Sequence, residues 1–286
     1  MSALEPKNNI NQLLRLTPKT YFGASFVKHL RIFLAFVKAS IQADMEYRLN
    51  FVSRVATDVV WYLAHILTFE TLYLHTSQIG GWTAPQMRVF LGLLFVVDAL
   101  FMILFNDNLE RFNDKIRKGD LDLLLMKPVN SQMMISLQRQ ATAILGNLVL
   151  ATAWLSWALY NLPGLQTQHL PLLLLYIPAG LTILYAIRFM VASMAVIFTR
   201  ADSLQYMWYQ IYKLGMRPDS IYSPWLRYAM ISVLPVLAVV ALPADAIVNG
   251  PGWGMTVYLV VLAGFFLWLS SKVWNFALSK YTSASS

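Results

Sequence analysis

Four side chains that can carry a charge or a proton lie inside apolar stretches of the sequence: Asp58, His65, Asp98 and Arg188. At about 1.5 Å per helical residue, the two aspartates and the arginine each lie on the order of 10 to 16 Å from the cytosolic end of their stretch, which predicts a similar depth for all three. A charge at that depth in a membrane costs at least about 2.5 kcal/mol, so it normally pairs or lines a polar path. The spacing predicts either an ion pair of Arg188 with Asp98 or Asp58, or a polar pathway. For His65, a hydrogen-bonded packing role competes with a place in that lining.

The chain as a whole is too apolar for an ordinary soluble domain. Of its 286 residues, 58% are hydrophobic and 13% are charged, and the mean hydropathy is +0.54. These values predict a membrane protein. The formal net charge of +8 comes from basic residues spread over short segments beside the apolar stretches. That distribution favours membrane orientation over nucleic-acid binding.

Six stretches have about the 20 residues that a helix needs to cross the hydrocarbon core of a membrane. They cover residues 51–74, 87–107, 141–160, 172–199, 227–247 and 255–273. None shows the period-two alternation of barrel strands, so we expect an all-helical membrane protein with six transmembrane helices. The connection at 243–254 is rich in Pro and Gly, and it either dips back into the membrane or forms an ordinary loop.

Lys and Arg are distributed unevenly between the two sides of this arrangement. They concentrate in four segments, which are residues 1–50, 108–140, 200–226 and 274–286. The three connections on the other side contain neither residue type. Because basic residues accumulate on the cytosolic side of membrane proteins, we expect both termini to be cytosolic.

Residues 21–47 differ from the six apolar stretches. Apolar side chains recur there at helical spacing, at Phe22, Phe26, Leu30, Phe33, Leu34 and Val37. Lys28, Arg31 and Lys38 lie off that stripe, which predicts an amphipathic helix in the inner interface, with a seventh short span as the alternative. We therefore expect a cytosolic N-terminal part, residues 1–47, that contains this helix, and a six-span membrane domain, residues 48–286.

Residues 116–132, with the sequence IRKGDLDLLLMKPVNSQ, form a short charged segment between two apolar stretches. Gly119 is expected to end the preceding helix in a left-handed conformation, and Asp120 to cap a new helix. Pro128 forces the next break. The segment thus predicts a helix of about two turns that lies across the inner surface of the membrane.

This short helix has an apolar face that it cannot bury by itself. The face consists of Leu121, Leu124 and Leu125. Three surroundings can cover it, namely the lipid headgroups, a groove on a cytosolic partner, or the end of its own helical bundle.

The sequence lacks the motifs of common catalytic sites. It has no cysteine, no Gly-Lys-Ser/Thr phosphate loop, no His-Glu-x-x-His helix and no Gly-x-Ser-x-Gly elbow. Its four His residues are scattered. We therefore expect no enzyme activity, no metal site and no cofactor in this chain.

The segment IRKGDLDLLLMKPVNSQ resembles the signature between the second and third spans of ABC-2 type exporter permeases. Three further segments follow in the order found in that family: FTRADSLQ (198–205), GMRPDSIYSPWLR (215–227) and VLPVLAVVALPADAIV (233–248). The resemblance covers about residues 20–280. The sequence departs from the family near Leu242, where a polar or aromatic residue is expected, and this affects the chemistry of the outer gate.

The resemblance implies the permease subunit of an ATP-driven exporter in the bacterial inner membrane, moving an amphipathic or lipid-like substrate outward. It implies two permease halves, identical or distinct, on two ABC ATPase subunits that bind ATP and Mg. The short helix would be the coupling helix, with its leucine face in a cleft of the ATPase and its charges fixing its direction. The residues implied in coupling are Arg117, Lys118, Gly119, Asp120, Leu121, Asp122, Leu124, Leu125 and Pro128.

Two functions of other classes stay open on the residues alone. A secondary transporter driven by protons would use Asp58, Asp98 and His65 as a proton relay. A non-transporting scaffold of an envelope complex would need neither a relay nor an ATPase.

Overall fold

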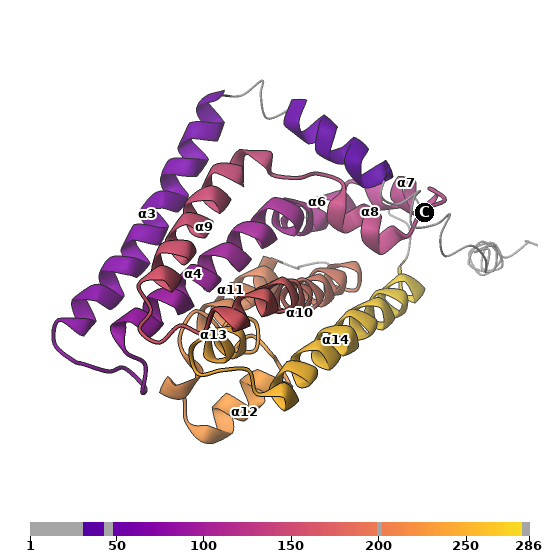
Figure 1. The fold of residues 1–286 in the computed structure, drawn as a ribbon. Coiled ribbons are helices and arrows are strands. Elements are labelled where there is room, and N and C mark those ends of the chain that lie inside the picture. The colour runs from indigo at the N-terminus through magenta and orange to yellow at the C-terminus, as the bar shows by residue number, and fades with distance from the viewer. Residues whose placement is uncertain (1–30, 43–47, 199–201, 282–286) are drawn as a thin grey trace, which may run out of the picture.

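The computed structural model describes residues 31–42, 48–198 and 202–281. Within these ranges the regular structure is helical, apart from one isolated β-bridge between Ile79 and Trp82. Long helices pack into a bundle, and most of the short helices lie toward its two ends (Figure 1). The prediction of an all-helical fold is confirmed.

A helix over residues 31–42 precedes α3. The helices that follow are α3 (Arg48–Tyr73), α4 (Ala84–Phe101), η1 (Met102–Asn106), α5 (Asp107–Glu110), α6 (Phe112–Arg117), α7 (Asp120–Leu125), α8 (Ser131–Leu137), η2 (Thr142–Ile144), α9 (Leu145–Tyr160), η3 (Thr167–Leu172), α10 (Leu173–Ser193), η4 (Met194–Val196), α11 (Asp202–Leu214), η5 (Asp219–Ile221), α12 (Pro224–Ser232), α13 (Ala241–Val248) and α14 (Trp253–Ser279). The π-helix η1 joins α4 to α5. We refer to the two ends of the bundle as the α7 end and the α12 end (Figure 1).

Three helices in the described ranges are long and apolar enough to cross a membrane. They are Ala84–Arg117, Thr167–Val196 and Trp253–Ser279, with 34, 30 and 27 residues. They coincide with the second, fourth and sixth predicted stretches. α9 is a shorter apolar helix at the third stretch, and α3 covers the first with a less apolar sequence. The sequence therefore located these five helices correctly.

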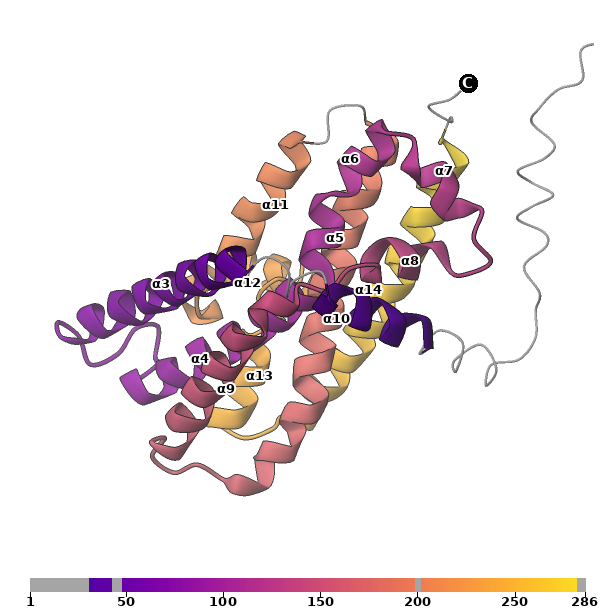
Figure 2. The same ribbon diagram turned by 90° about the horizontal axis from the view of Figure 1, so that it is seen from above.

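α4 is the central helix of the bundle. In its most apolar window 78% of the residues are buried inside the protein, against 33% for α14. α9 packs along α4, and α14 packs along α10 (Figures 1 and 2). Gly92 permits the first of these contacts, because a Cβ at this position would lie 2.9 Å from the Cα of Leu155. Such close backbone approach requires glycine.

The prediction of a continuous fifth span over residues 227–247 is wrong. α12 ends at Ser232 and α13 begins at Ala241. Pro235 lies in the gap and cannot donate the backbone hydrogen bond that a continuous helix needs. Instead, α11 packs along α10 and runs from the α7 end toward the α12 end (Figure 2). The Lys and Arg content of residues 200–226 predicts that this segment is cytosolic, and the polar residues of α11 keep it out of the apolar stretches.

Two contacts show that α11 and the residues after it extend from one end of the bundle to the other. At its start, Gln205 Nε2 donates to the Glu110 carbonyl of α5 at 3.1 Å. Beyond its end, Ser220 lies against Gly80 in the α3–α4 connection, where a Cβ on the glycine would be 2.6 Å from Ser220 Oγ. Residues 205 and 220 therefore lie toward opposite ends of the bundle.

Residues 235–240 are buried and pass between α10 and the end of α11. The carbonyl oxygen of Val239 approaches Gly180 of α10, and that of Val236 approaches Gly215, so closely that a Cβ on either glycine would lie 2.5 or 2.7 Å away. The helix that follows, α13, is buried against α4 and α10. In the connection at 243–254, the residues up to Val248 are therefore a buried helix and not an ordinary loop.

The helix over residues 31–42 lies at the α7 end. Ile32 and Phe36 pack against the buried cluster of α6, α7 and α8. Ser40 Oγ accepts a hydrogen bond of 3.0 Å from a backbone nitrogen just after α8. These three residues are spaced one turn apart, whereas Leu34, which the sequence placed on the packing stripe, is 56% exposed. The other parts of the predicted amphipathic helix, residues 21–30 and 43–47, lie outside the described residues.

Candidate functional site

α7 is the short helix predicted between the second and third apolar stretches. Gly119 adopts a φ of 78°, so its predicted left-handed conformation is confirmed. The prediction that Asp120 caps α7 is wrong, because Gly119 occupies the N-cap position and Asp120 is the first helical residue. Its carboxylate there suits the positive end of the helix dipole. Pro128 follows three residues after Leu125, the last residue of α7.

The predicted leucine face of α7 is covered by the protein's own bundle. Leu121 is 0% exposed and Leu124 is 5% exposed. Both pack in a cluster with Phe112 of α6 and Trp274 of α14, and Leu125 is half-buried at its edge. Of the three surroundings considered for this face, the end of the bundle is the one observed. These leucines therefore anchor α7 to the bundle and leave its other side exposed.

The exposed face of α7 consists of Leu123 and Met126. Their exposures are 62% and 77%, and they lie three residues apart, on one side of the helix. Sequence reasoning missed these two residues, because three consecutive leucines define no unique stripe. Phe112 and Trp274 pack against the side of α7 that carries Leu121 and Leu124. This packing decides which leucines are buried and which are exposed.

Charged side chains border the exposed face of α7. Arg117 Nη2 forms an exposed salt bridge of 2.8 Å with Asp114 Oδ1. Lys118 and Asp120 are exposed, and Asp122 is half-buried. Charges of both signs thus surround two exposed apolar side chains.

A buried polar network fixes α8, the helix that follows α7. Gln132 Nε2 donates to Tyr185 Oη of α10 at 3.2 Å and to Ser270 Oγ of α14 at 3.0 Å. Gln132 Oε1 accepts from Ser271 Oγ at 2.8 Å, and Ser136 Oγ lies 2.8 Å from the same tyrosine hydroxyl. Every polar atom of the Gln132 amide is therefore paired, which holds α8 against two long helices. Sequence reasoning missed Gln132, although a glutamine directly before Met133, Met134 and Ile135 was a signal.

The π-helix η1 and Asn108 connect the other side of α8 to the central helix. Asn108 Oδ1 accepts from the backbone nitrogen of Arg139 at 3.0 Å, and its Nδ2 donates to the Ser136 carbonyl at 2.9 Å. Within η1, the Ile103 carbonyl accepts from the Ala141 nitrogen at 3.0 Å. π-helical turns leave such carbonyls for outside partners and often mark functional sites. A displacement of α8 would therefore reach the helix that contains α4 and α5 directly.

Arg188 and Asp98 do not pair, and the predicted ion pair is wrong. Asp98 accepts a hydrogen bond of 2.6 Å from Tyr212 Oη, whereas Arg188 Nη2 lies 3.5 Å from Gln205 Oε1. The two partners belong to α11 and lie two turns apart, which is about 10 Å at 1.5 Å per residue. The arginine and the aspartate thus lie at different depths, because counting residues from the ends of their stretches ignored how the helices are offset.

Asp58 lies beside Asp98 rather than beside the arginine. It accepts a hydrogen bond from Asn147 Nδ2 of α9, and its carboxylate is near enough to interact electrostatically with that of Asp98. His65 Nδ1 lies 3.0 Å from the Trp61 carbonyl of its own helix, the packing role expected from the sequence.

This all-helical bundle contains apolar helices long enough to span a membrane and presents a short helix at one end, as expected for a membrane protein. A family model described as ABC-2 family transporter protein matches residues 59–285, and the chain belongs to this family. It is thus an ABC transporter permease, and its family implies association with an ABC ATPase. Comparisons with curated proteins and with solved structures gave no match.

Proposed function

We propose that the protein is the permease subunit of an ATP-driven exporter that moves an amphipathic or lipid-like compound out of the cytosol or the inner leaflet. The observation that carries the proposal is α7, which Leu121 and Leu124 anchor while Leu123 and Met126 face outward. Two exposed apolar side chains within a charged border suit a cleft on a partner protein. The ABC ATPase implied by the family is the natural partner.

In this proposal the chain crosses the bacterial inner membrane six times, with residues 1–47 and the end of α14 in the cytosol. The crossings are α3, Ala84–Arg117, α9, Thr167–Val196, α11 with the residues that follow it to Ser223, and α14. The 13 residues of α11 alone rise only about 20 Å, so the fifth crossing needs the residues beyond it. Replacing the fifth predicted span by α11 keeps the number of crossings and the side of both termini. Residues 48–286 then form the membrane domain, and the helix over 31–42 belongs to an interfacial helix.

The distribution of basic residues supports α7 on the cytosolic side. The α7 end carries the Lys and Arg residues of α6 to α8, whereas the connections 74–83, 161–166 and 249–252 have none. The basic residues toward the α12 end are Arg88, Lys213, Arg217 and Arg227. Two of these charges are offset, because Arg88 pairs with Glu70 at 2.6 Å and Arg227 with Asp219 at 2.5 Å.

The part of this chain in transport is mechanical, since ATP and Mg would bind to the partner subunits. Closure of two ATPases would draw together the α7 helices of two permease halves, identical or distinct. α7 leads directly into α8, so its displacement would reach α10 and α14 through Gln132 and α5 through Asn108. An interface between the halves with two stable arrangements would convert this motion into alternating access.

Leu123→Asp tests the proposed coupling role of α7. Because Leu123 is 62% exposed, the change should alter the free energy of unfolding by no more than about 0.5 kcal/mol. It should nevertheless release the ATPase from the purified complex or uncouple ATP hydrolysis from transport, since a charge replaces a buried contact of the interface. Co-purification of the ATPase and transport by the same preparation are the measurements.

Two matched variants separate coupling from folding. Leu74→Asp introduces the same charge at a position that is 82% exposed near the α12 end, and it should leave the complex intact. Leu124→Asp buries a carboxylate at a 5% exposed position, so it should destabilise the bundle by about 3 kcal/mol or more. If the ATPase stays bound and coupled in Leu123→Asp, the coupling role of this face is refuted.

A further inference from the structure

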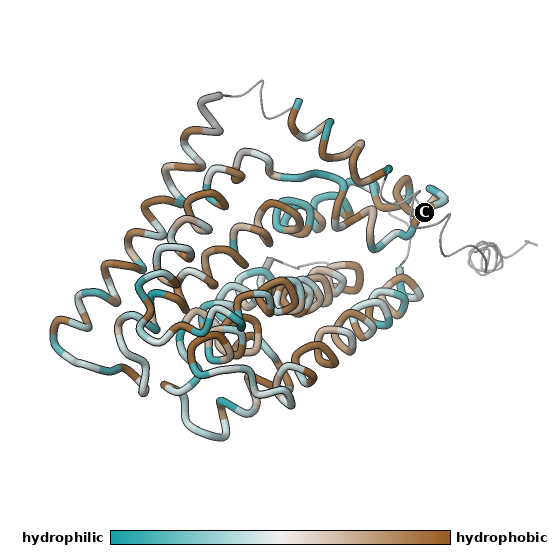
Figure 3. Tube along the Cα trace, in the orientation of Figure 1, coloured by the Kyte–Doolittle hydropathy of each residue, from teal (hydrophilic) through white to brown (hydrophobic). Residues whose placement is uncertain are grey.

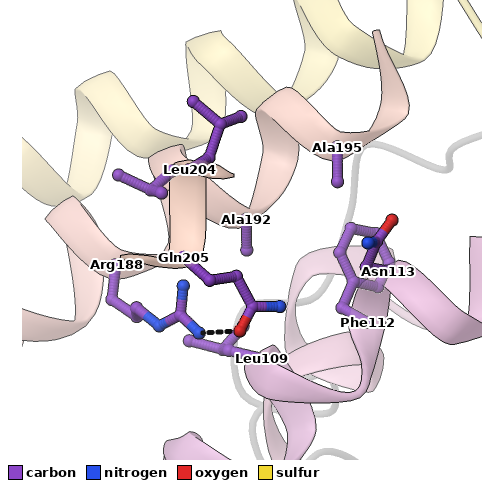
Figure 4. A pocket seen from close by; sticks show the side chains of 9 residues that line it. Leu109, Phe112, Asn113, Arg188, Ala192, Ala195, Leu204 and Gln205 are labelled. Carbon is purple, nitrogen blue, oxygen red and sulfur yellow. Dashed lines mark hydrogen bonds between the residues drawn. The ribbon is translucent and has the colours of Figure 1, made fainter. Parts of the chain in front are cut away.

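Arg188 points into a small cavity between α10, α11 and the α5–α6 segment (Figure 4). Apolar side chains make up most of the wall, and Asn113 and Gln205 are its other polar residues. The cavity is partly open to the surface and admits about one water-sized atom. It therefore has room for a single oxygen of a larger group whose remainder lies at the opening.

The guanidinium of Arg188 is incompletely paired although it is fully buried. The residue is 0% exposed, yet its Nε and Nη1 have no hydrogen-bond partner among the residues that the structure describes. Its contacts are the long 3.5 Å bond to Gln205 and a position over the Trp208 ring, 5.9 Å from the ring centre. Glu110 acts on it electrostatically without a salt bridge, and its exposed carboxylate accepts instead from Asn106.

Such a group favours an anionic ligand. A buried charge that keeps unpaired N–H donors loses more hydration energy than its few contacts return. N–H donors of arginine form strong charge-assisted hydrogen bonds to the oxygens of phosphate and carboxylate groups. The wall beside Arg188 continues to the surface through Val191 and Leu204, both half-exposed. The cavity thus combines one strong cationic donor group with an apolar path to the outside.

We propose that Arg188 binds the oxyanion headgroup, phosphate or carboxylate, of an amphipathic substrate. One headgroup oxygen occupies the cavity, and the apolar chain follows the wall of Val191 and Leu204. This inference rests on the proposed export of an amphipathic compound, and it adds that the compound is an anion.

Binding of matched amphiphiles to the purified protein in nanodiscs tests the proposal. The probes are decyl phosphate, decyl maltoside and decyltrimethylammonium, which share a chain and differ in headgroup charge. Decyl phosphate should bind more tightly than the other two. Arg188→Gln should weaken it on the order of 10- to 100-fold, as expected for the loss of a charge-assisted hydrogen bond, and leave the other two unchanged.

Arg217→Gln is the control, because Arg217 is exposed and follows α11; it should leave binding of decyl phosphate unchanged. Equal affinity of all three probes, or equal binding of decyl phosphate to the wild type and Arg188→Gln, would overturn the proposal. Displacement of decyl phosphate by inorganic phosphate at the same concentration would also overturn it, since the site would then hold a free anion.

Arg188→Lys keeps the test decisive if Arg188→Gln does not fold. Lysine retains the charge but presents fewer donors, so decyl phosphate should bind more weakly than to the wild type and still more tightly than decyl maltoside. Unchanged affinity for decyl phosphate in this variant would count against the proposal. Binding is measured without the ATPase, so the two proposals are tested separately. Failure of the ATPase to co-purify would contradict the proposed function and would not affect the binding result.

Discussion

At the scale of single residues, uncharged partners on neighbouring helices hold the buried polar groups of this bundle. Asp98 is bonded to Tyr212, Asp58 to Asn147 and Gln132 to hydroxyl groups. The sequence located Asp58 and Asp98 in apolar stretches correctly. Their partners could not be predicted, because they depend on how far each helix is shifted along its neighbour.

Tyr212→Phe tests the pairing of Asp98. Removing the hydroxyl leaves the carboxylate without its 2.6 Å hydrogen bond, so the free energy of unfolding should fall by about 1.5–3 kcal/mol. The loss should shrink when Asp98→Asn is also present. Tyr206→Phe, on the same helix but 68% exposed, is the control.

A second double-mutant cycle, with Arg188→Leu and Asp98→Asn, tests whether these two residues form an ion pair. The effects of Arg188→Leu and Asp98→Asn on unfolding should add within about 0.5 kcal/mol, because the two groups lie at different depths. A larger rescue of Arg188→Leu by Asp98→Asn would restore the ion pair and contradict the geometry.

At the scale of elements, α8 is the link between α7 and the long helices. Gln132→Leu should reduce transport more than ATP hydrolysis, because it removes the bonds to α10 and α14. It should also lower the free energy of unfolding by about 1–3 kcal/mol, since the partner hydroxyls stay buried. Coupling ratios of purified complexes are the measurement, and Gln168→Leu, exposed on η3, is the control. An unchanged ratio of transport to hydrolysis would exclude α8 as the link.

The passage of residues 235–240 through the bundle depends on glycine. In Gly180→Ala the new Cβ would meet the Val239 carbonyl oxygen at 2.5 Å, so the segment must shift, at a cost of about 1–3 kcal/mol. Gly264→Ala on α14 meets nothing within 4 Å and should be neutral or slightly stabilising. Chemical unfolding of the two variants in detergent compares them, and equal stability would place residues 235–240 elsewhere.

Hydropathy and turn residues predicted most of the helices, but not the path of the fifth crossing. α4, α9, α10 and α14 contain long apolar stretches (Figure 3), and the glycine at 119 marks the start of α7. α11 is amphipathic and packs its apolar side inward, so it resembled a surface helix. Residues 227–247 form an apolar run of the same length as a membrane-spanning helix, although much of it is buried inside the bundle. Hydropathy and length do not distinguish these two cases.

At the scale of the whole molecule, α11 places residues 215–223 near the α12 end, whereas basic residues alone assigned them to the cytosol. The other elements lie at the ends of the bundle that the sequence predicts for them, and α7 lies at the end opposite to α12 (Figure 1). The proposed transport cycle depends on that separation. The ATPase must reach α7 from the cytosol, and the substrate must leave at the other end.

Cysteine labelling in intact cells tests this separation most directly, because the chain contains no native cysteine. Lys118→Cys and Ser223→Cys each create one exposed thiol at a position that is exposed in the structure. A membrane-impermeant maleimide added outside should label Ser223→Cys at once and Lys118→Cys only after the membrane is permeabilised. Labelling of Lys118→Cys in intact cells would place α7 on the outer side and contradict its role as the contact for an ATPase.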